Sequence, residues 1–117
     1  GYSIEAPESR FLFTGDTAWF DDAVSIGEQY GPFDLAAIPI GAYAPRDFMK
    51  YSHVDVEEAL RLKGALQAKA AVPIHWGTFP LTTEPVLAPR ELLQETMKVR
   101  ADADSFTSWL IGETKQF

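Results

Sequence analysis

The stretch Arg10-Phe11-Leu12-Phe13-Thr14-Gly15-Asp16-Thr17 decides the fold predicted for this chain. Three consecutive large apolar residues are typical of a buried strand, and the Gly-Asp-Thr tripeptide follows directly after it. A second apolar run leads into Ile74-His75-Trp76-Gly77-Thr78. Open α/β sheets build their sites just beyond the carboxyl ends of the strands. We therefore expect Asp16 and His75, which both can bind a metal, to face one crevice at the edge of a sheet.

Apolar runs and helical stripes alternate along the whole chain. Short apolar runs predict strands at residues 3–5, 10–14, 33–38, 70–74 and 105–111. Apolar residues at helical spacing predict helices between residues 16 and 31, from 55 to about 66, and from 89 to about 100. Residues 39–51 and 75–88 are predicted to be loops. From residue 10 onward strands and helices alternate, which predicts an α/β fold with parallel strands and crossover helices in one unit, residues 1–117.

Composition limits the possible functions of the chain. It has 117 residues, 46% of them hydrophobic, a formal net charge of −7 and a pI of about 4.7. Such an acidic chain is not expected to bind nucleic acid, which requires a positive field. Without cysteine, disulfides and cysteine-based zinc sites are excluded. There is no apolar run long enough to span a membrane and no signal-peptide pattern at the start.

The two residues at the strand ends each have a structural alternative. Asp16 has two carboxylate oxygens that can bind one metal or bridge two, but an Asp between a strand and a helix is most often an N-cap. His75 has the commonest metal-binding side chain, but it could equally be a core histidine bonded to a carbonyl. The predicted position of both residues at the same edge of a parallel sheet favours the metal-binding interpretation.

A third candidate region precedes the second helix. His53 could bind a metal, donate to a phosphate or act as a general acid, or it could simply be an exposed residue at the helix entry. The loop before it combines the cations Arg46 and Lys50 with Phe48, Met49 and Tyr51. Cations interleaved with apolar groups suit an anionic lipid surface or a phosphate ester, although a solvated loop is an alternative.

The quoted motifs resemble those of one known family. The stretch 33–43, the segment 48–55 and the motifs containing Asp16 and His75 are similar to the N-acyl-phosphatidylethanolamine-hydrolysing phospholipase D family of the metallo-β-lactamase superfamily. The resemblance extends from about Phe11 to Met97. It implies half of a metallo-β-lactamase αββα sandwich, with this chain similar to the C-terminal half.

The resemblance also implies a site and a reaction. Two zinc ions would occupy the crevice, with Asp16 bridging them and His75 as the last histidine ligand of one. By this resemblance His53 would lie at the mouth of the site near the substrate phosphate, and Asp16, His53 and His75 would form the catalytic set. From the composition of their loop, Arg46, Lys50 and Tyr51 are expected to bind the substrate together with His53. The implied reaction is hydrolysis of N-acyl-phosphatidylethanolamine to N-acylethanolamine and phosphatidic acid.

One part of the family pattern is missing from these 117 residues. The His-x-His-x-Asp-His motif, which supplies most of the metal ligands, does not occur here. A zinc centre needs three or more protein ligands per metal, so this chain alone is expected to bind zinc poorly and not to catalyse. We expect it to be a truncated product or one chain of a split enzyme, completed by an N-terminal half.

Two other functions stay open. A related metal-dependent hydrolase could act on a lactone or a small phosphoester, or an inactive fragment could serve as an interaction module that forms homo-oligomers through a sheet edge. The expected location is the cytoplasm or, through the loop at residues 46–51, a peripheral membrane surface.

Overall fold

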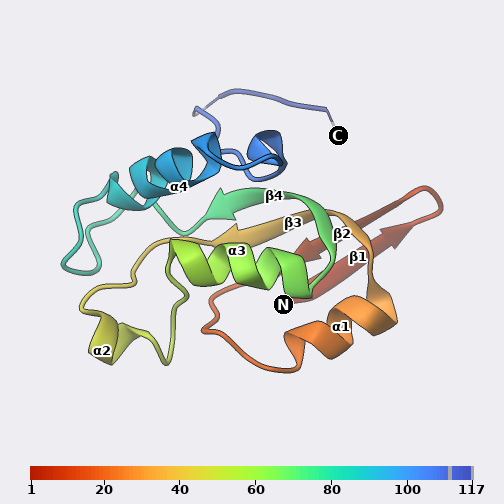
Figure 1. Cartoon of the computed structure of the whole chain (residues 1–117), viewed down its shortest axis with the longest axis horizontal. Coiled ribbons are helices and arrows are strands. Elements are labelled where there is room, and N and C mark those ends of the chain that lie inside the picture. The colour runs from red at the N-terminus through yellow and green to blue at the C-terminus, as the bar shows by residue number, and fades with distance from the viewer. Residues whose placement is uncertain (111, 117) are drawn as a thin grey trace.

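A single sheet organises the described residues, 1–110 and 112–116, of this computed structural model (Figure 1). Its strand order is β1-β2-β3-β4. β1 (Tyr2–Ala6) and β2 (Ser9–Phe13) form an antiparallel hairpin, and β3 (Phe33–Pro39) and β4 (Ala68–Ile74) add to β2 in parallel. The predicted α/β class and the parallel pairing are therefore confirmed. The hairpin is antiparallel because two residues are too few for a crossover connection.

The helices of the crossovers gather on one side of this sheet. α1 (Ala23–Tyr30) connects β2 to β3, whereas α2 (Arg46–Met49) and α3 (Val56–Ala65) connect β3 to β4. Figure 1 shows α3 lying across β3 and β4, with α1 beside it. α4 (Ala88–Lys98) packs against the other side of α3. No helix within the described residues is long and apolar enough to cross a membrane.

The predicted start of α3 is confirmed in detail. Asp55 is its N-cap, and a carboxylate oxygen of Asp55 accepts a hydrogen bond of 2.8 Å from the backbone N–H of Glu58. This contact satisfies one of the free donors at a helix start. The apolar face of the helix then packs on the sheet, with Val56, Ala59 and Leu62 almost completely buried. α3 is thus a well-anchored element immediately after His53.

The core lies between the sheet and these helices. Buried side chains of the sheet, among them Leu12, Ala36, Ile38 and Ala71, pack against the apolar face of α3. Residues on the opposite face are apolar too but remain accessible. Tyr2, Ile4 and Phe13 on the hairpin are 75%, 62% and 39% exposed. Tyr2 pairs with Phe13 and Ile4 pairs with Phe11. Because directly opposite residues on neighbouring strands point to the same face of the sheet, all four side chains lie on this face.

Two expectations about the elements are wrong, and the N-cap alternative for Asp16 is excluded. The first helix lies between residues 16 and 31 as predicted, but it begins at Ala23 with Asp22 as its N-cap, so Asp16 does not cap it. Residues 46–49, predicted to be loop, form the short helix α2. The predicted strand at 105–111 is replaced by a 3-10 helix, η1 (Ala103–Ser105), and a single bridge from Phe106 to Ala71.

The error at the C-terminal end has a physical reason. Phe106 is fully buried, but Ser105 and Thr107 on either side of it are polar and Leu110 is 65% exposed, so one buried side chain does not extend into a strand ladder. Residues 114–116 form no helix or strand, in agreement with the predicted tail. Residues 111 and 117, the last positions of the predicted strand and tail, lie outside the described residues.

Candidate metal centre

Asp16 and His75 meet at the carboxyl edge of the parallel strands. A carboxylate oxygen of Asp16 lies 3.5 Å from Nε2 of His75. β3 separates the strands that carry the two residues, but all three strands end at the same edge. The predicted proximity of these side chains is thus confirmed. The Asp16 side chain is 64% exposed and that of His75 22%, so the pair is open to solvent on one side.

His53 completes a three-residue cluster. Its ring stacks on that of His75, with centroids 4.8 Å apart and an interplanar angle of 26°. One ligand atom from each of Asp16, His53 and His75 lies within 4.8 Å of the other two. The ring is partly buried, so the alternative of an exposed residue at the helix entry is wrong. Burial, followed by the neighbouring His75, lowers the pKa of His53.

The backbone at these positions is unusual. His75 has φ of 59°, a left-handed conformation that costs about 1–2 kcal/mol for residues other than glycine. Gly41, at the end of the neighbouring strand, lies so close that an added Cβ would sit 2.2 Å from the carbonyl oxygen of His75. Gly15, before Asp16, also has a positive φ of 67°. The local fold therefore requires glycine beside both predicted ligands.

The loops that carry the cluster are bonded to one another. The N–H of Val54 donates to the carbonyl of Thr17 over 2.9 Å, which links the Asp16 loop to the His53 loop. The N–H of Ile40 donates to the carbonyl of Ile74 over 3.1 Å, next to His75. Main-chain bonds thus bring together three loops that are far apart in sequence.

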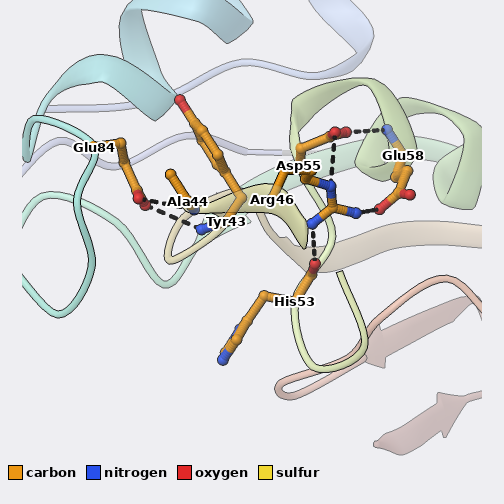
Figure 2. A network of polar contacts seen from close by, with 7 residues as sticks. All are labelled: Tyr43, Ala44, Arg46, His53, Asp55, Glu58 and Glu84. Atoms are coloured by element: carbon orange, nitrogen blue, oxygen red, sulfur yellow. Dashed lines mark hydrogen bonds and ion pairs between the residues drawn. The ribbon is translucent and has the colours of Figure 1, made fainter. Parts of the chain in front are cut away.

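Arg46, which was predicted to bind the substrate, has three partners within this chain. Figure 2 shows its guanidinium between the carbonyl of His53 and the carboxylates of Asp55 and Glu58. The contact with His53 measures 2.7 Å and the contact with Asp55 3.3 Å. Two carboxylates already balance its charge, so the geometry does not favour the predicted role of Arg46 in substrate binding.

Lys50 and Tyr51 lie in the exposed turn after α2. The Lys50 ammonium is 5.1 Å from the centroid of the Tyr51 ring. Phe48 and Tyr51 are 75% and 77% exposed, so two aromatic side chains project from this short segment. The predicted substrate-binding role of Lys50 and Tyr51 stays a prediction.

Glu84 is a structural residue of the site that sequence reasoning missed. Its carboxylate accepts hydrogen bonds from the backbone N–H groups of Tyr43 and Ala44, at 3.1 and 3.0 Å (Figure 2). Burial raises its pKa, but bonds from Thr82 and from the backbone of Ala44 and Tyr43 outweigh burial and leave the pKa lowered. Its backbone partners Tyr43 and Ala44 are 41 and 40 positions away in sequence, so no local signal could have identified it.

The cluster has the chemistry of an incomplete metal centre. A carboxylate and two imidazoles are oxygen and nitrogen ligands that zinc and other transition metals accept. Nδ1 of His53 is buried and has no hydrogen-bond partner among the described residues, so one ring nitrogen is not used by the fold. A cavity of about 230 Å³ adjoins His75, and Trp76, Thr78, Phe79 and Leu81 line it as well. These residues fit a metal, and a dinuclear site would require further ligands.

Comparisons with known proteins agree with this arrangement. Residues 1–76 match the model of the beta-lactamase superfamily domain, and the chain therefore belongs to the beta-lactamase superfamily. It is 46% identical, over 97% of its length, to the N-acyl-phosphatidylethanolamine-hydrolyzing phospholipase D 1 of Caenorhabditis elegans. The similarity to this phospholipase D family, predicted from the sequence, is confirmed.

Two further relatives extend the comparison. A UPF0173 metal-dependent hydrolase of Thermococcus onnurineus is 30% identical over 87% of the chain, which covers 40% of that protein. The solved structure of Igni18, a metallo hydrolase of Ignicoccus hospitalis, superposes with a TM-score of 0.65 at 27% identity. The superposition covers 98% of this chain and 44% of Igni18. Together with the family match, it confirms the prediction that the fold is part of a metallo-β-lactamase domain. The chain spans about a third of the Caenorhabditis relative.

Proposed function

We propose that this chain is the C-terminal half of a zinc-dependent phosphodiesterase of the phospholipase D type. Together with an N-terminal half, it would hydrolyse N-acyl-phosphatidylethanolamine to N-acylethanolamine and phosphatidic acid. The observation that carries the proposal is the convergence of Asp16, His53 and His75 from three loops at one edge of the sheet. The 46% identity to a protein named for this reaction supports the choice of substrate.

The residues of the cluster have distinct proposed roles. Asp16 would hold two zinc ions together, and His75 would bind one of them. Zinc supplies Lewis acidity, which makes water a usable nucleophile near neutral pH and offsets negative charge on the phosphate. His53 lies beside His75, where its imidazole could donate a hydrogen bond to a phosphate oxygen as charge develops there.

The central test is zinc content and lipid hydrolysis by the complete protein. The wild type should contain two zinc ions per molecule and release N-acylethanolamine from lipid vesicles. Asp16→Asn, which keeps the size of the side chain but removes its charge, should lose most of the zinc and at least about 10³-fold in rate. Asp104→Asn, at a position on η1, is the matched control and should keep both. Full zinc occupancy in Asp16→Asn would refute the bridging role.

A second substrate class stays open. The similarity to a UPF0173 metal-dependent hydrolase, whose name specifies no substrate, shows that related sequences are not all named for phospholipids. The alternative is therefore a hydrolase of a lactone or a small phosphoester. Turnover of such compounds by a zinc-loaded protein that leaves N-acyl-phosphatidylethanolamine intact would favour this alternative.

The accessible face of the sheet supports the proposed N-terminal half. Tyr2, Ile4 and Phe13 form an apolar surface on the face opposite α3. An exposed apolar surface of this kind marks an interface. We propose that the N-terminal half packs on this face and brings the remaining zinc ligands to the edge where Asp16 and His75 lie.

Mixing experiments separate this proposal from an inert interaction module. The chain and a separate polypeptide with the preceding half of the domain should form a one-to-one complex that binds zinc. The double variant Ile4→Ser, Phe13→Ser should weaken this complex at least about tenfold, because two apolar side chains leave the interface. Self-association of the chain without zinc uptake by the mixture would favour the module.

We also propose peripheral contact with a membrane through α2 and the turn after it. Phe48 and Tyr51 project into solvent, and Lys50 lies between them in sequence. The double variant Phe48→Ser, Tyr51→Ser should reduce pelleting with anionic vesicles, because aromatic side chains bind at the lipid interface. Val99→Ser, at an 88% exposed position, is the control and should pellet like the wild type. Unchanged pelleting of the double variant would contradict the proposal.

A further inference from the structure

Arg46 is the centre of a polar network beside the cluster. Its Nη1 donates to the carbonyl oxygen of His53 over 2.7 Å, and its Nε lies 3.3 Å from an oxygen of Asp55. Its Nη2 contacts the carboxylate of Glu58. All three nitrogens of the guanidinium thus have a partner within this chain (Figure 2).

The partners of Arg46 connect His53 to a rigid element. Asp55 caps α3 through the N–H of Glu58, and the helix is anchored by its buried apolar face. Through these carboxylates, the guanidinium connects the His53 carbonyl to the first turn of α3. The planar fork of an arginine suits this task, because its donors point in defined directions toward several acceptors at once.

The other peptide groups around His53 are also bonded. The N–H of His53 donates to the carbonyl of Met49 over 2.9 Å, and the N–H of Val54 donates to the carbonyl of Thr17. The imidazole itself is held differently. Its Nδ1 has no partner among the described residues, and the ring stacks on His75. The position of the ring therefore depends on its backbone, and Arg46 bonds to that backbone.

We propose that Arg46 is a positioning residue that holds the imidazole of His53 against His75 by way of the His53 carbonyl. Figure 2 shows the carbonyl of His53 directed at the guanidinium and its ring directed away from it. The proposal deepens the proposed function and rests on it for the catalytic consequence. It replaces a direct contact of Arg46 with the substrate phosphate, which would have to compete with two carboxylates.

The first test is a double-mutant cycle in the complete zinc-loaded protein with N-acyl-phosphatidylethanolamine vesicles. Arg46→Met should lower kcat at least about tenfold with little change in KM, because a displacement of about 1 Å can cost 10²-fold in rate. In the His53→Ala background the same substitution should lower kcat less than about twofold. Equal losses in both backgrounds would overturn the proposal.

Conservative variants separate positioning from phosphate binding. Arg46→Lys keeps the charge but replaces the three-nitrogen fork by one ammonium, so it should restore little of the lost kcat. Restoration to near the wild-type kcat by Arg46→Lys would show that charge alone matters, and would overturn the proposal. Arg100→Met, which breaks an exposed pair with Asp102 at 2.8 Å, is the control and should keep the wild-type kcat.

The second test needs no activity. The chain contains two histidines, so the complete protein can be labelled with 13C-histidine in this segment alone, which leaves His53 and His75 as its only labelled rings. The wild type and Arg100→Met should show a nuclear Overhauser contact between the two rings, and Arg46→Met should lose or weaken it by at least about half while remaining folded by circular dichroism. If Arg46→Met does not fold, Arg46→Lys replaces it in this comparison.

The two tests distinguish failure of this inference from failure of the proposed function. An unchanged ring contact in the folded Arg46 variants would overturn the positioning role, whatever the enzyme hydrolyses. Loss of the ring contact in a protein that does not act on the lipid would support the positioning role and refute the proposed reaction.

Discussion

The two ends of the parallel strands both carry networks of charged residues, but these networks have different surroundings. At the carboxyl ends, Arg46 and Glu84 bond to backbone groups of loops, and both side chains are partly buried. At the amino ends, Asp34 accepts from the ammonium of Lys69 over 2.7 Å and from the N–H of Arg10 over 2.8 Å. The side chains of Lys69 and Asp34 are 63% and 36% exposed, so this second network is the more exposed of the two.

The difference shows that ion pairs alone do not identify the part of the molecule in which loops must be held in defined positions. Asp34 accepts one backbone N–H, that of Arg10 on a neighbouring strand, and water and salt compete with its exposed pair with Lys69. Glu84 accepts two backbone N–H groups from a distant loop, and these bonds fix the position of that loop. At the carboxyl edge the backbone is also compact, as the contact between Gly41 and His75 shows. We therefore expect substitutions at this edge to have larger effects than equivalent ones at the amino edge.

The largest effect is expected for Gly41→Ala. The added methyl group would lie 2.2 Å from the carbonyl oxygen of His75, so two backbone segments must move apart. Overpacking of this kind costs about 1–3 kcal/mol, and we expect the upper end of that range because neither neighbour is a flexible side chain. Urea unfolding measures the loss. A free energy of unfolding equal to that of the wild type would contradict the tight contact.

Gly64→Ala is the matched control for this substitution. Gly64 lies inside α3, and a Cβ added there would meet nothing within 4 Å. Because alanine is the better helix former, the free energy of unfolding should rise by about 0.5–1 kcal/mol. A loss of stability in Gly64→Ala would show that any Cβ is unfavourable in this chain and would weaken the argument from Gly41.

A smaller effect is expected for Glu84→Gln, and it should depend on pH. Hydrogen bonds to a charged acceptor contribute about 1.5–3 kcal/mol, and glutamine keeps part of this, so we expect a loss of about 1 kcal/mol near pH 7. The folded-state pKa of Glu84 lies below its ordinary value of 4.5. The contribution of the Glu84 carboxylate to the free energy of unfolding is therefore complete above about pH 4.5. It is lost as the pH falls through the lower pKa of the folded state.

Urea unfolding of wild type and Glu84→Gln between pH 3 and pH 7 checks this dependence. The two proteins should differ most at neutral pH and converge in acid. A difference that grows as the pH falls would contradict the assigned role of the carboxylate.

The smallest effect is expected for Asp34→Asn at the amino edge. The hydrogen bond from Lys69, followed by that from Arg10, lowers the pKa of Asp34, but the Lys69 side chain that supplies the first bond is 63% exposed. The melting temperature should change less than in Glu84→Gln, and 1 M NaCl should remove the difference from wild type, because salt screens exposed pairs. A decrease in melting temperature that persists in 1 M NaCl and exceeds the decrease in Glu84→Gln would refute the contrast between the two edges.

Local sequence was sufficient where a signal and its structural cause lie close together. The start of α3 depends on Asp55 and Glu58, three positions apart, and it was predicted correctly. The motif around Asp16 and the apolar run before His75 predicted two strand ends at one edge of the sheet. The strand predicted at 105–111 failed because apolar character specifies burial and does not specify strand pairing.

The sequence by itself determined the α/β class, the parallel strands and the placement of Asp16 and His75 at one edge of the sheet, since these follow from short-range apolar patterns and from strand direction. Only the tertiary structure decided that His53 stacks on His75, that Arg46 bonds to the His53 carbonyl and that Glu84 joins two loops. The physical reason is that these contacts depend on the paths of loops, and the path of a loop depends on main-chain partners that lie far away in the sequence.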